Sequence, residues 1–234
     1  MKLSLLATVF VALSTIACSA AVDSDPISSE DDLTKDAGAK GASDAAADAS
    51  SPAAAKDGGA AANEFTDERD GASYALVTFG KQKWFARNLN FKTTGSFCYD
   101  DDEANCDDQG RLYTFAAAQK ACPTGSHLGS DADWKALEES LGMDDADLDA
   151  EGYSTLRGTD EGTTLKKKSG FGAKMAGFRG GGAYDAQGDR TYFWTSSTRG
   201  SDVWRRRIAA AESTVFRFTN PPADFAISVR CVVD

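Results

Sequence analysis

The sequence predicts an α+β fold for residues 64–234, after an N-terminal stretch that has no core of its own. Three observations favour this fold: all four Trp residues lie in this part, two short helix signals come early in it, and strand-like runs lie at both of its ends. Its length suits a single domain. We expect two helices packed on antiparallel sheets, together with a long Gly-rich irregular region.

The domain begins with an expected β-hairpin. Residues 74–79 are Tyr-Ala-Leu-Val-Thr-Phe, a run rich in β-branched and aromatic side chains. Residues 80–83, Gly-Lys-Gln-Lys, are typical of a turn, and residues 84–91 follow as the second strand.

Two helix signals flank a turn at residues 122–129. Residues 114–121 predict a short Ala-rich helix that Pro123 ends, because proline lacks the backbone N–H. Ser130 is a good N-cap for a second helix, whose apolar side chains recur at the i, i+3, i+7 spacing of one buried face. Gly142 then ends this helix.

From residue 143 to residue 190 the periodicity fades and glycine becomes frequent. A long irregular region inside a domain usually binds something or moves, and within it only residues 175–179 resemble a strand. Regular structure then returns in four expected strands, which are 191–197, 203–210, 213–218 and 225–232.

The N-terminus has the features of an export signal. Lys2 and the apolar run 3–17 fit a signal peptide, and the run is too short for a comfortable transmembrane helix. Residues 15–18, Thr-Ile-Ala-Cys, resemble the lipobox of bacterial lipoproteins, in which the Cys is acylated. We therefore expect a signal peptide at 1–17, lipidation at Cys18, and an outer-membrane lipoprotein held to the membrane by its lipid anchor. The alternative is ordinary cleavage nearby and a free tail.

Residues 18–63 have the composition of an acidic low-complexity tether. From residue 19 to residue 63 there are nine Asp or Glu, three Lys and no aromatic residue, which predicts disorder. The whole chain has a net charge of -11. A negative surface argues against nucleic acid as a partner, because binding to phosphates needs a basic one.

Four Cys residues remain besides the expected lipidation site, and an oxidising compartment favours disulfides between them. Three pairings are possible. Cys98 and Cys106 enclose a short polar loop and are most simply paired with each other, which leaves Cys122 for Cys231. The second bridge would tie the end of the first helix to the last strand. The alternative is that all four are buried free thiols.

Candidate metal ligands lie in the loop between the first two of these Cys residues. Asp100, Asp102 and Glu103 supply the hard oxygen ligands that Ca²⁺ prefers. The loop lacks the spacing and the glycine of an EF-hand, so a solvated acidic loop is the alternative. No other cofactor is expected.

The sequence singles out no catalytic residue. His127 is the sole His, so one chain has neither a His-based triad nor a two-His metal site, and its ordinary role is that of a turn residue hydrogen-bonded to backbone. Acidic residues abound, but nothing marks two of them as the pair that glycosidic cleavage needs.

The candidate ligand-binding residues are Tyr184, Trp194, Trp204 and Arg206. They lie in or beside the Gly-rich region, and exposed aromatic faces suit sugar rings or protein surfaces. On a strand, Trp204 and Arg206 share one face with Ile208, and the arginines at 205 and 207 share the other. The alternatives are a core position for Trp194 and a purely structural stacking of Arg on Trp.

Several motifs run in order through the domain. They are Gly80-x-x-x-Trp84 with Arg87-Asn88-Leu89, Cys98-Tyr99-Asp100 with Glu103-Ala104-Asn105-Cys106, Gly110-Arg111-Leu112-Tyr113-Thr114, Cys122-Pro123-x-Gly125-x-His127-Leu128, Asp131-Ala132-Asp133-Trp134, Phe193-Trp194-Thr195-Ser196-Ser197, and Ser228-Val229-Arg230-Cys231-Val232. With them the domain resembles the Fibrobacter succinogenes major paralogous domain, a family of exported bacterial surface proteins. Ser126 and Gly129 depart from the residues common in that family, which concerns the detail of one turn.

The resemblance implies a C-type lectin-like fold, in which strands from both chain ends pair and a Cys near the first helix is bridged to the last strand. It implies no established activity. We therefore expect a cell-surface lipoprotein with a non-catalytic binding or adhesion domain for a polysaccharide or a surface protein. The alternatives are a hydrolase or other envelope enzyme on the same scaffold, and a structural envelope component.

Overall fold

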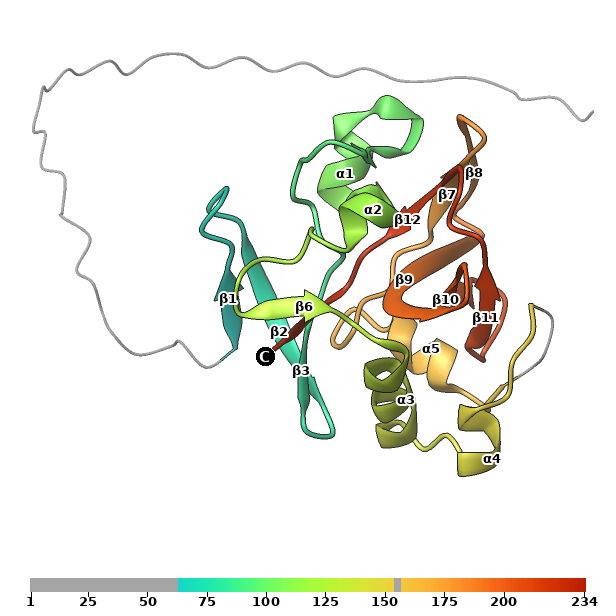
Figure 1. Ribbon diagram of the computed structural model, residues 1–234. Coiled ribbons are helices and arrows are strands. Elements are labelled where there is room, and N and C mark those ends of the chain that lie inside the picture. Colours follow the sequence, from blue (N-terminus) through green and yellow to red (C-terminus); the bar gives the residue numbers. More distant parts are fainter. Residues whose placement is uncertain (1–62, 154–156) are drawn as a thin grey trace, which may run out of the picture. The chain divides into compact units, whose positions relative to one another are not determined.

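Two β-sheets and several short helices make up the part of the chain that the structure describes. In this computed structural model the described residues are 63–153 and 157–234, and their fold is α+β with more strand than helix (Figure 1). The expected signal peptide, the expected tether up to residue 62 and Cys18 lie outside these residues. Within them, no helix has both the length and the apolar character needed to cross a membrane.

The smaller sheet joins the first strands of the domain to its last one. Its strand order is β1-β2-β3-β13-β6, and all neighbours are antiparallel. The strands are β1 (Glu64–Thr66), β2 (Ser73–Phe79), β3 (Gln82–Phe85), β6 (Ser126–Leu128) and β13 (Cys231–Val233). The expected hairpin is confirmed as β2 and β3, with Leu76 opposite Phe85, although its second strand is shorter than expected.

The larger sheet has the strand order β11-β10-β9-β7-β12-β5-β4, with β8 paired to β7. Its strands are β4 (Ser96–Phe97), β5 (Leu112–Thr114), β7 (Ala176–Gly180), β8 (Ala183–Gln187), β9 (Arg190–Arg199), β10 (Asp202–Ala209), β11 (Phe216–Asn220) and β12 (Phe225–Ser228). The expected hairpin near residues 203–218 is confirmed as β10 and β11, in which Arg206 lies opposite Arg217.

The helices are short. They are the 3-10 turn η1 (Tyr99–Asp101) and the α-helices α1 (Glu103–Gln109), α2 (Phe115–Ala118), α3 (Asp131–Ser140), α4 (Asp145–Leu148) and α5 (Glu161–Lys166). The start of α3 is confirmed: the Ser130 hydroxyl accepts from the Asp133 N–H at 3.1 Å, and the Asp133 carboxylate accepts from the Ser130 N–H at 2.8 Å. This reciprocal capping box fixes the first turn of α3.

Three local expectations need correction. The helix expected over residues 114–121 is the single turn α2, because Thr114 belongs to β5 and accepts a hydrogen bond from Ala117 as its cap. The segment between Cys98 and Cys106 contains η1 and the first turn of α1, whose N-terminus Asp102 caps, so Cys106 itself lies in a helix. The region 143–190 is more regular than expected, because α4, α5, β7 and β8 lie in it.

Two disulfides join Cys98 to Cys106 and Cys122 to Cys231. The pairing that local proximity favoured is therefore confirmed. The second bridge spans 109 residues of sequence, and it attaches the segment after α2 to β13. The bridge therefore ties β13, which lies inside the smaller sheet between β3 and β6, to the segment that follows α2.

The expected last strand is two strands, β12 in the larger sheet and β13 in the smaller one, with a break at Arg230. The Arg230 side chain is buried there, and it donates hydrogen bonds to the backbone oxygens of Phe85 and Phe171 and to Asn88 Oδ1. Burial holds the pKa of Arg230 well below its ordinary value. The break is therefore held by a buried cation that binds three separate segments.

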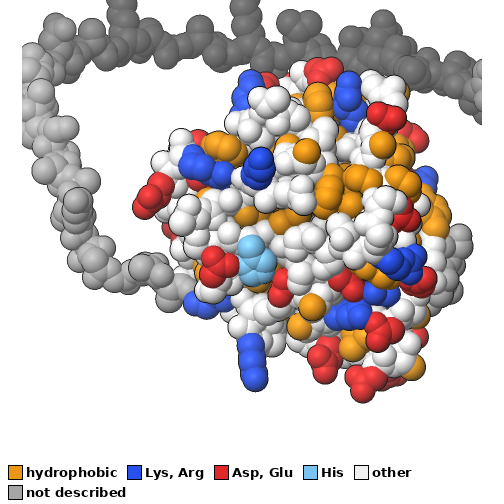
Figure 2. Space-filling view, in the orientation of Figure 1, with side chains coloured by type: hydrophobic (Ala, Val, Ile, Leu, Met, Phe, Trp, Pro, Cys, Tyr) orange, Lys and Arg blue, Asp and Glu red, His pale blue; other side chains and the backbone are white. Residues whose placement is uncertain are grey.

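His127 on β6 links α3 to the C-terminal residue. Its Nδ1 lies 2.7 Å from Asp234 Oδ1 and its Nε2 lies 3.2 Å from Asp133 Oδ2, and Figure 2 shows this histidine at the surface beside acidic side chains. The expectation of a turn histidine bound to backbone is therefore corrected, because carboxylates hold both ring nitrogens. Desolvation opposes the charged ring, but the two carboxylates outweigh it and raise the pKa of His127.

This histidine gives a testable pH dependence. We expect an NMR titration to give His127 a pKa above its ordinary value of about 6.5, and Asp234→Asn to lower that pKa. Because the folded-state pKa is the higher one, the stabilisation is fully present below about pH 6.5 and is lost as the pH rises through the folded-state pKa. An unchanged titration in Asp234→Asn would contradict the assignment of the shift to this carboxylate.

Candidate functional site

Alternating side chains place arginines between aromatic rings on one face of the larger sheet. The antiparallel register sets Arg205 and Arg207 of β10 each opposite an aromatic residue of β9 and opposite another of β11. Directly opposed side chains on one face of a sheet lie in contact distance. The two resulting rows are Trp194, Arg205 and Phe218, and Tyr192, Arg207 and Phe216.

These rows border a pocket of about 240 Å³. A neighbouring hollow of about 340 Å³ shares Tyr153, Phe218 and Asn220 with it, and we call the two together the aromatic groove. The pocket is lined by Tyr153, Phe178, Tyr192, Phe218, Phe225 and Ile227 and by the polar residues Asp185, Arg190, Arg205 and Asn220. A small number of precisely placed polar groups among aromatic rings is typical of small-ligand sites.

Arg205 is a cation in this pocket without a carboxylate partner. Its side chain is 3% exposed, and its guanidinium lies 4.3 Å from the ring centre of Trp194 and 5.0 Å from that of Phe225. Its Nη2 donates to the Pro221 carbonyl at 2.6 Å, whereas its buried Nε has no hydrogen-bond partner. Burial lowers the pKa of Arg205 to about 10. The fold therefore keeps a desolvated positive charge beside the pocket.

Arg207 has the same character one row further along. It is 9% exposed, lies 3.7 Å from the ring centre of Phe216 and 4.4 Å from that of Tyr153, and its buried Nε is also unpartnered. Neither Arg205 nor Arg207 forms an ion pair with any described residue. Cation–π stacking stabilises both guanidinium groups but does not neutralise them.

Two tyrosines and a third arginine complete the rim of the pocket. The hydroxyls of Tyr153 and Tyr192 lie 2.7 Å apart, and Tyr153 is 44% exposed. Burial raises the pKa of Tyr192 to about 12. Partial burial also raises that of Tyr153, but the side chains of Tyr192, Arg207 and Arg190 outweigh it and lower the pKa. Arg190 differs from the other two arginines, because it pairs with Asp189 at 2.6 Å.

The lining of the groove does not offer a free pair of carboxylates. Asp185 lies in the pocket and Glu151 in the adjoining hollow. Glu151 accepts two hydrogen bonds from Arg199 Nη1, at 2.7 and 2.9 Å, so this carboxylate is held in an ion pair. Among the residues that line the groove, the chemistry therefore favours binding over acid and base catalysis.

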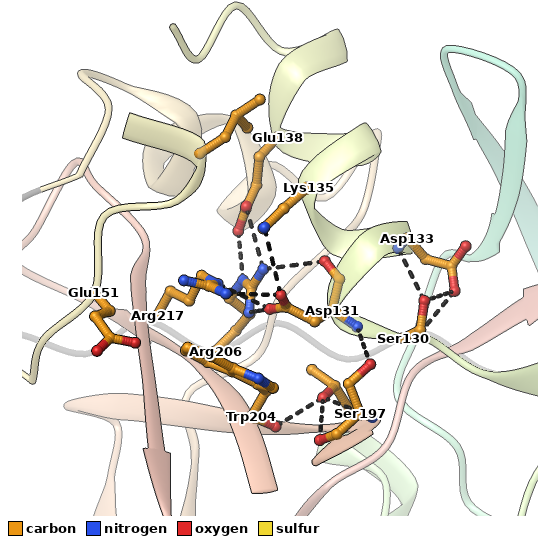
Figure 3. Close-up of polar contacts among 12 residues, drawn as sticks. Ser130, Asp131, Asp133, Lys135, Glu138, Glu151, Ser197, Trp204, Arg206 and Arg217 are labelled. Atoms are coloured by element: carbon orange, nitrogen blue, oxygen red, sulfur yellow. Dashed lines mark hydrogen bonds and ion pairs between the residues drawn. The ribbon is translucent and has the colours of Figure 1, made fainter. Parts of the chain in front are cut away.

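The opposite face of the same strands carries a buried ion network against α3 (Figure 3). Arg206 donates to Glu138 Oε1 and to Asp131 Oδ1, both at 2.7 Å. Arg217 holds the other side of Asp131, and Arg157 pairs with Glu138 at 2.5 Å. Burial would raise the pKa of Asp131, but its arginine partners lower it to about 2.

Two of the four candidate ligand-binding residues, Arg206 and Trp194, are buried in the domain. Arg206 is 0% exposed and all its described contacts are internal, so it braces α3 against the sheet and does not reach a ligand. Trp194 is also 0% exposed, and its Nε1 donates to the Tyr113 carbonyl at 2.7 Å. The placement of Trp194 therefore fits its alternative role as a core residue.

The other two candidates lie near the surface but outside the groove. Trp204 is half-buried between the guanidinium groups of Arg217 and Arg199, at 3.6 and 4.8 Å from its ring centre. Tyr184 stacks on Tyr99 and donates its hydroxyl proton to Asp101 at 2.6 Å. The structure therefore does not bring the four candidates together in one site.

The acidic loop keeps most of its charge in protein contacts. The Glu103 carboxylate lies 2.6 Å from Arg111 and 3.0 Å from Lys92, and Asp102 caps α1. A calcium ion on Glu103 would have to displace both cations. Calcium binding at Asp100, Asp102 and Glu103 stays a prediction, and the loss of these ion pairs would weaken the binding.

A larger hollow of about 540 Å³ lies between the start of the domain and the segment after α5, and it has a different character. Its lining includes no aromatic residue. Two of its lysines are already engaged: Lys166 donates to the backbone oxygens of Ala209, Ala210 and Glu212, and Lys174 pairs with Asp108. We therefore take the aromatic groove as the candidate site despite its smaller volume.

Sequence reasoning missed the groove, because it followed the aromatic residues one by one. The signal was the alternation itself: Arg190, Tyr192 and Trp194 at every second position of one strand, and Arg205 and Arg207 at every second position of the next. Reading this alternation across the expected hairpin would have placed all five side chains on one face.

The comparisons with known proteins support the family that the motifs indicated. The model of the Fibrobacter succinogenes major domain matches residues 77–233, which is more than half of the chain. The comparison with curated proteins gave no match, and neither did the comparison with solved structures. The chain therefore belongs to the Fibrobacter succinogenes major domain family.

Proposed function

We propose that this chain is an exported surface lipoprotein whose family domain is a non-catalytic binding module, with the aromatic groove as its ligand site. The observation that carries the proposal is the groove itself, in which exposed and half-buried rings surround a few polar groups. Aromatic faces of this kind suit sugar rings and protein surfaces. We propose a polysaccharide as the ligand, and a surface protein is the outcome to test against it.

Two features support the lectin-like part of the proposal. β13, from the end of the chain, pairs with β3, from the start of the domain, and the Cys122–Cys231 bridge ties that strand to the segment after α2. Both are what the family resemblance led us to expect of a C-type lectin-like arrangement. The lipid anchor at Cys18 and the outer-membrane location remain proposals from the sequence, and acylation is checked by mass spectrometry of the N-terminal peptide from the exporting cell.

The binding role has a direct test. The full chain is screened against an array of glycans and cell-wall polysaccharides, and we expect binding that Tyr153→Ala weakens at least tenfold. The reason is that Tyr153 is 44% exposed and lines both parts of the groove, so its ring contacts a ligand and its removal leaves the core intact. A repeat in EDTA decides whether calcium takes part.

Tyr184→Ala is the matched control for this variant. Like Tyr153→Ala, it removes one tyrosine ring, but Tyr184 does not line the groove. Tyr184 belongs to β8, where its side chain lies on the face opposite to that of Asp185. We expect Tyr184→Ala to bind as the parent does. Binding that survives Tyr153→Ala but is lost in Tyr184→Ala would move the site to the other side of the ribbon and contradict the proposal.

A further inference from the structure

Arg205, which lines the groove, and Arg207, in the row beside it, carry positive charges that no ion pair neutralises. Arg205 and Arg207 are both more than nine-tenths buried, both lack an ion pair among the described residues, and both have a buried Nε without a partner. A buried charge without an ion-pair partner is costly, because water no longer solvates it, and the ring contacts and the carbonyl hydrogen bond of Arg205 replace that solvation only in part. The chain as a whole is acidic, at -11, so this local excess of positive charge runs against the general composition.

The stacking around these arginines leaves their charge available. The guanidinium of Arg205 lies 4.3 Å from the ring centre of Trp194 and 5.0 Å from that of Phe225, and its Nη2 donates to the Pro221 carbonyl, so these contacts hold the guanidinium in place. A fixed planar fork is the geometry that binds a carboxylate through two parallel hydrogen bonds. Because the rings hold the fork, little side-chain entropy is lost when an anion binds.

The remaining groups of the pocket suit a sugar ring better than a simple anion. Tyr153, Phe178 and Phe225 offer aromatic faces, and the polar groups Asp185 and Asn220 accept hydrogen bonds from hydroxyls. A carboxylate such as Asp185 would repel a small free anion, but it is the ordinary acceptor for the hydroxyls of a sugar. The volume of about 240 Å³ lies below the range of about 300–1,000 Å³ that is usual for whole ligands, and it fits one residue of a polymer.

We infer that the aromatic groove binds a uronate residue of an acidic polysaccharide, with the carboxylate of the sugar on Arg205 and its ring against the aromatic wall. This inference rests on the proposed binding function and names its ligand class. The adjoining hollow, which shares Tyr153 and Asn220 with the pocket, takes the next residue of the polymer.

The test compares each acidic polymer with its own methyl ester, which keeps the sugar rings and removes the charge. The full chain is titrated calorimetrically with polygalacturonate and polymannuronate, with the methyl esters of both, and with polyglutamate. We expect at least one of the polyuronates to bind, and its ester and polyglutamate to bind at least tenfold more weakly. The ester cannot form the charge-assisted bidentate pair with the guanidinium, and polyglutamate has no sugar ring to pack against the aromatic wall.

Variants then locate the charge. Arg205→Met keeps the unbranched apolar stem of the side chain and removes the guanidinium with its charge, and we expect at least a tenfold loss for the polyuronate and little change for the ester. Arg190→Met, at a more exposed position on the rim, is the second variant in case Arg205→Met fails to fold, and we expect a smaller loss in the same direction. Lys81→Gln removes one positive charge from the exposed β2–β3 turn and is the control for non-specific attraction.

The outcomes separate this inference from the binding function on which it rests. Equal affinity for acid and ester, with both lost in Tyr153→Ala, would keep the groove as a sugar site and overturn the uronate. Polyglutamate binding as tightly as the polyuronate would overturn the sugar in favour of an acidic protein. Failure of both polyuronates to bind would overturn the inference, while the glycan screen would still decide the binding function.

Discussion

Glu138→Gln is expected to lower the free energy of unfolding by about 3–5 kcal/mol, the range measured when one partner of a buried ion pair is removed. Glu138 is 0% exposed and holds two buried arginines, Arg206 at 2.7 Å and Arg157 at 2.5 Å. Glutamine has a similar shape but no charge. The substitution therefore leaves two guanidinium groups in the interior with too little negative charge around them.

Urea unfolding of the oxidised full chain, followed by tryptophan fluorescence, measures this loss. Glu139→Gln is the control, because Glu139 is the next residue of α3 and is exposed. We expect its effect to stay within about 0.5 kcal/mol, as for other surface substitutions. A loss below about 1 kcal/mol for Glu138→Gln would show that water or a neighbouring group takes over the two arginines.

Removing the long disulfide is expected to have the other large effect. The Cys122–Cys231 bridge spans 109 residues, and the chain-entropy model gives such a loop about 4.7 kcal/mol. The Cys98–Cys106 bridge spans 8 residues, for which the same model gives about 2.5 kcal/mol. The double variant Cys122→Ser/Cys231→Ser should therefore lose more stability than Cys98→Ser/Cys106→Ser.

Chemical denaturation of the two double variants, side by side, checks this order. Each variant keeps the other bridge, so the short-loop variant controls for the cost of introducing serine in place of half-cystine. Equal losses would mean that the unfolded chain keeps its two ends together without the covalent bond. A larger loss from the short loop would indicate that α1 depends on its bridge more than the whole domain does on the long one.

Much of the fold follows from local chemistry that the sequence displays. Ser130 followed three residues later by Asp133 has the spacing of a capping box, so residues 130–133 are enough to predict the start of α3. The aromatic and hydroxyl residues of 191–197 likewise predict β9 with little help from the rest of the chain.

The parts that sequence reasoning missed depend on contacts between distant segments. The break at Arg230 requires Asn88 and Phe171 to meet its guanidinium, and neither is near it in sequence. The burial of Arg206 depends on carboxylates from α3, more than 60 residues earlier. Local patterns placed this side chain on the correct face of β10, but only the packing of α3 decides that this face is the interior.

The site follows the same division. The alternation on β9 and β10 sets which side chains share a face, and this was available from the sequence. The groove also needs Tyr153, which precedes α5, and Phe225 of β12, and no pattern near either residue indicates that they line one pocket with Arg205. The sequence therefore predicts that Arg205 and Arg207 share a face of β10, whereas the aromatic residues that surround them from other segments are known only from the fold.

The place of β13 inside the smaller sheet has a consequence for the order in which the domain folds. β13 is the last strand of the described residues, yet it lies between β3 and β6 and carries one half of the long bridge. Until β13 docks, β3 and β6 each present an unpaired strand edge, which is a template for aggregation. A partly folded domain in which residues 231–233 have not yet paired with both neighbours is therefore the form most exposed to edge-to-edge association.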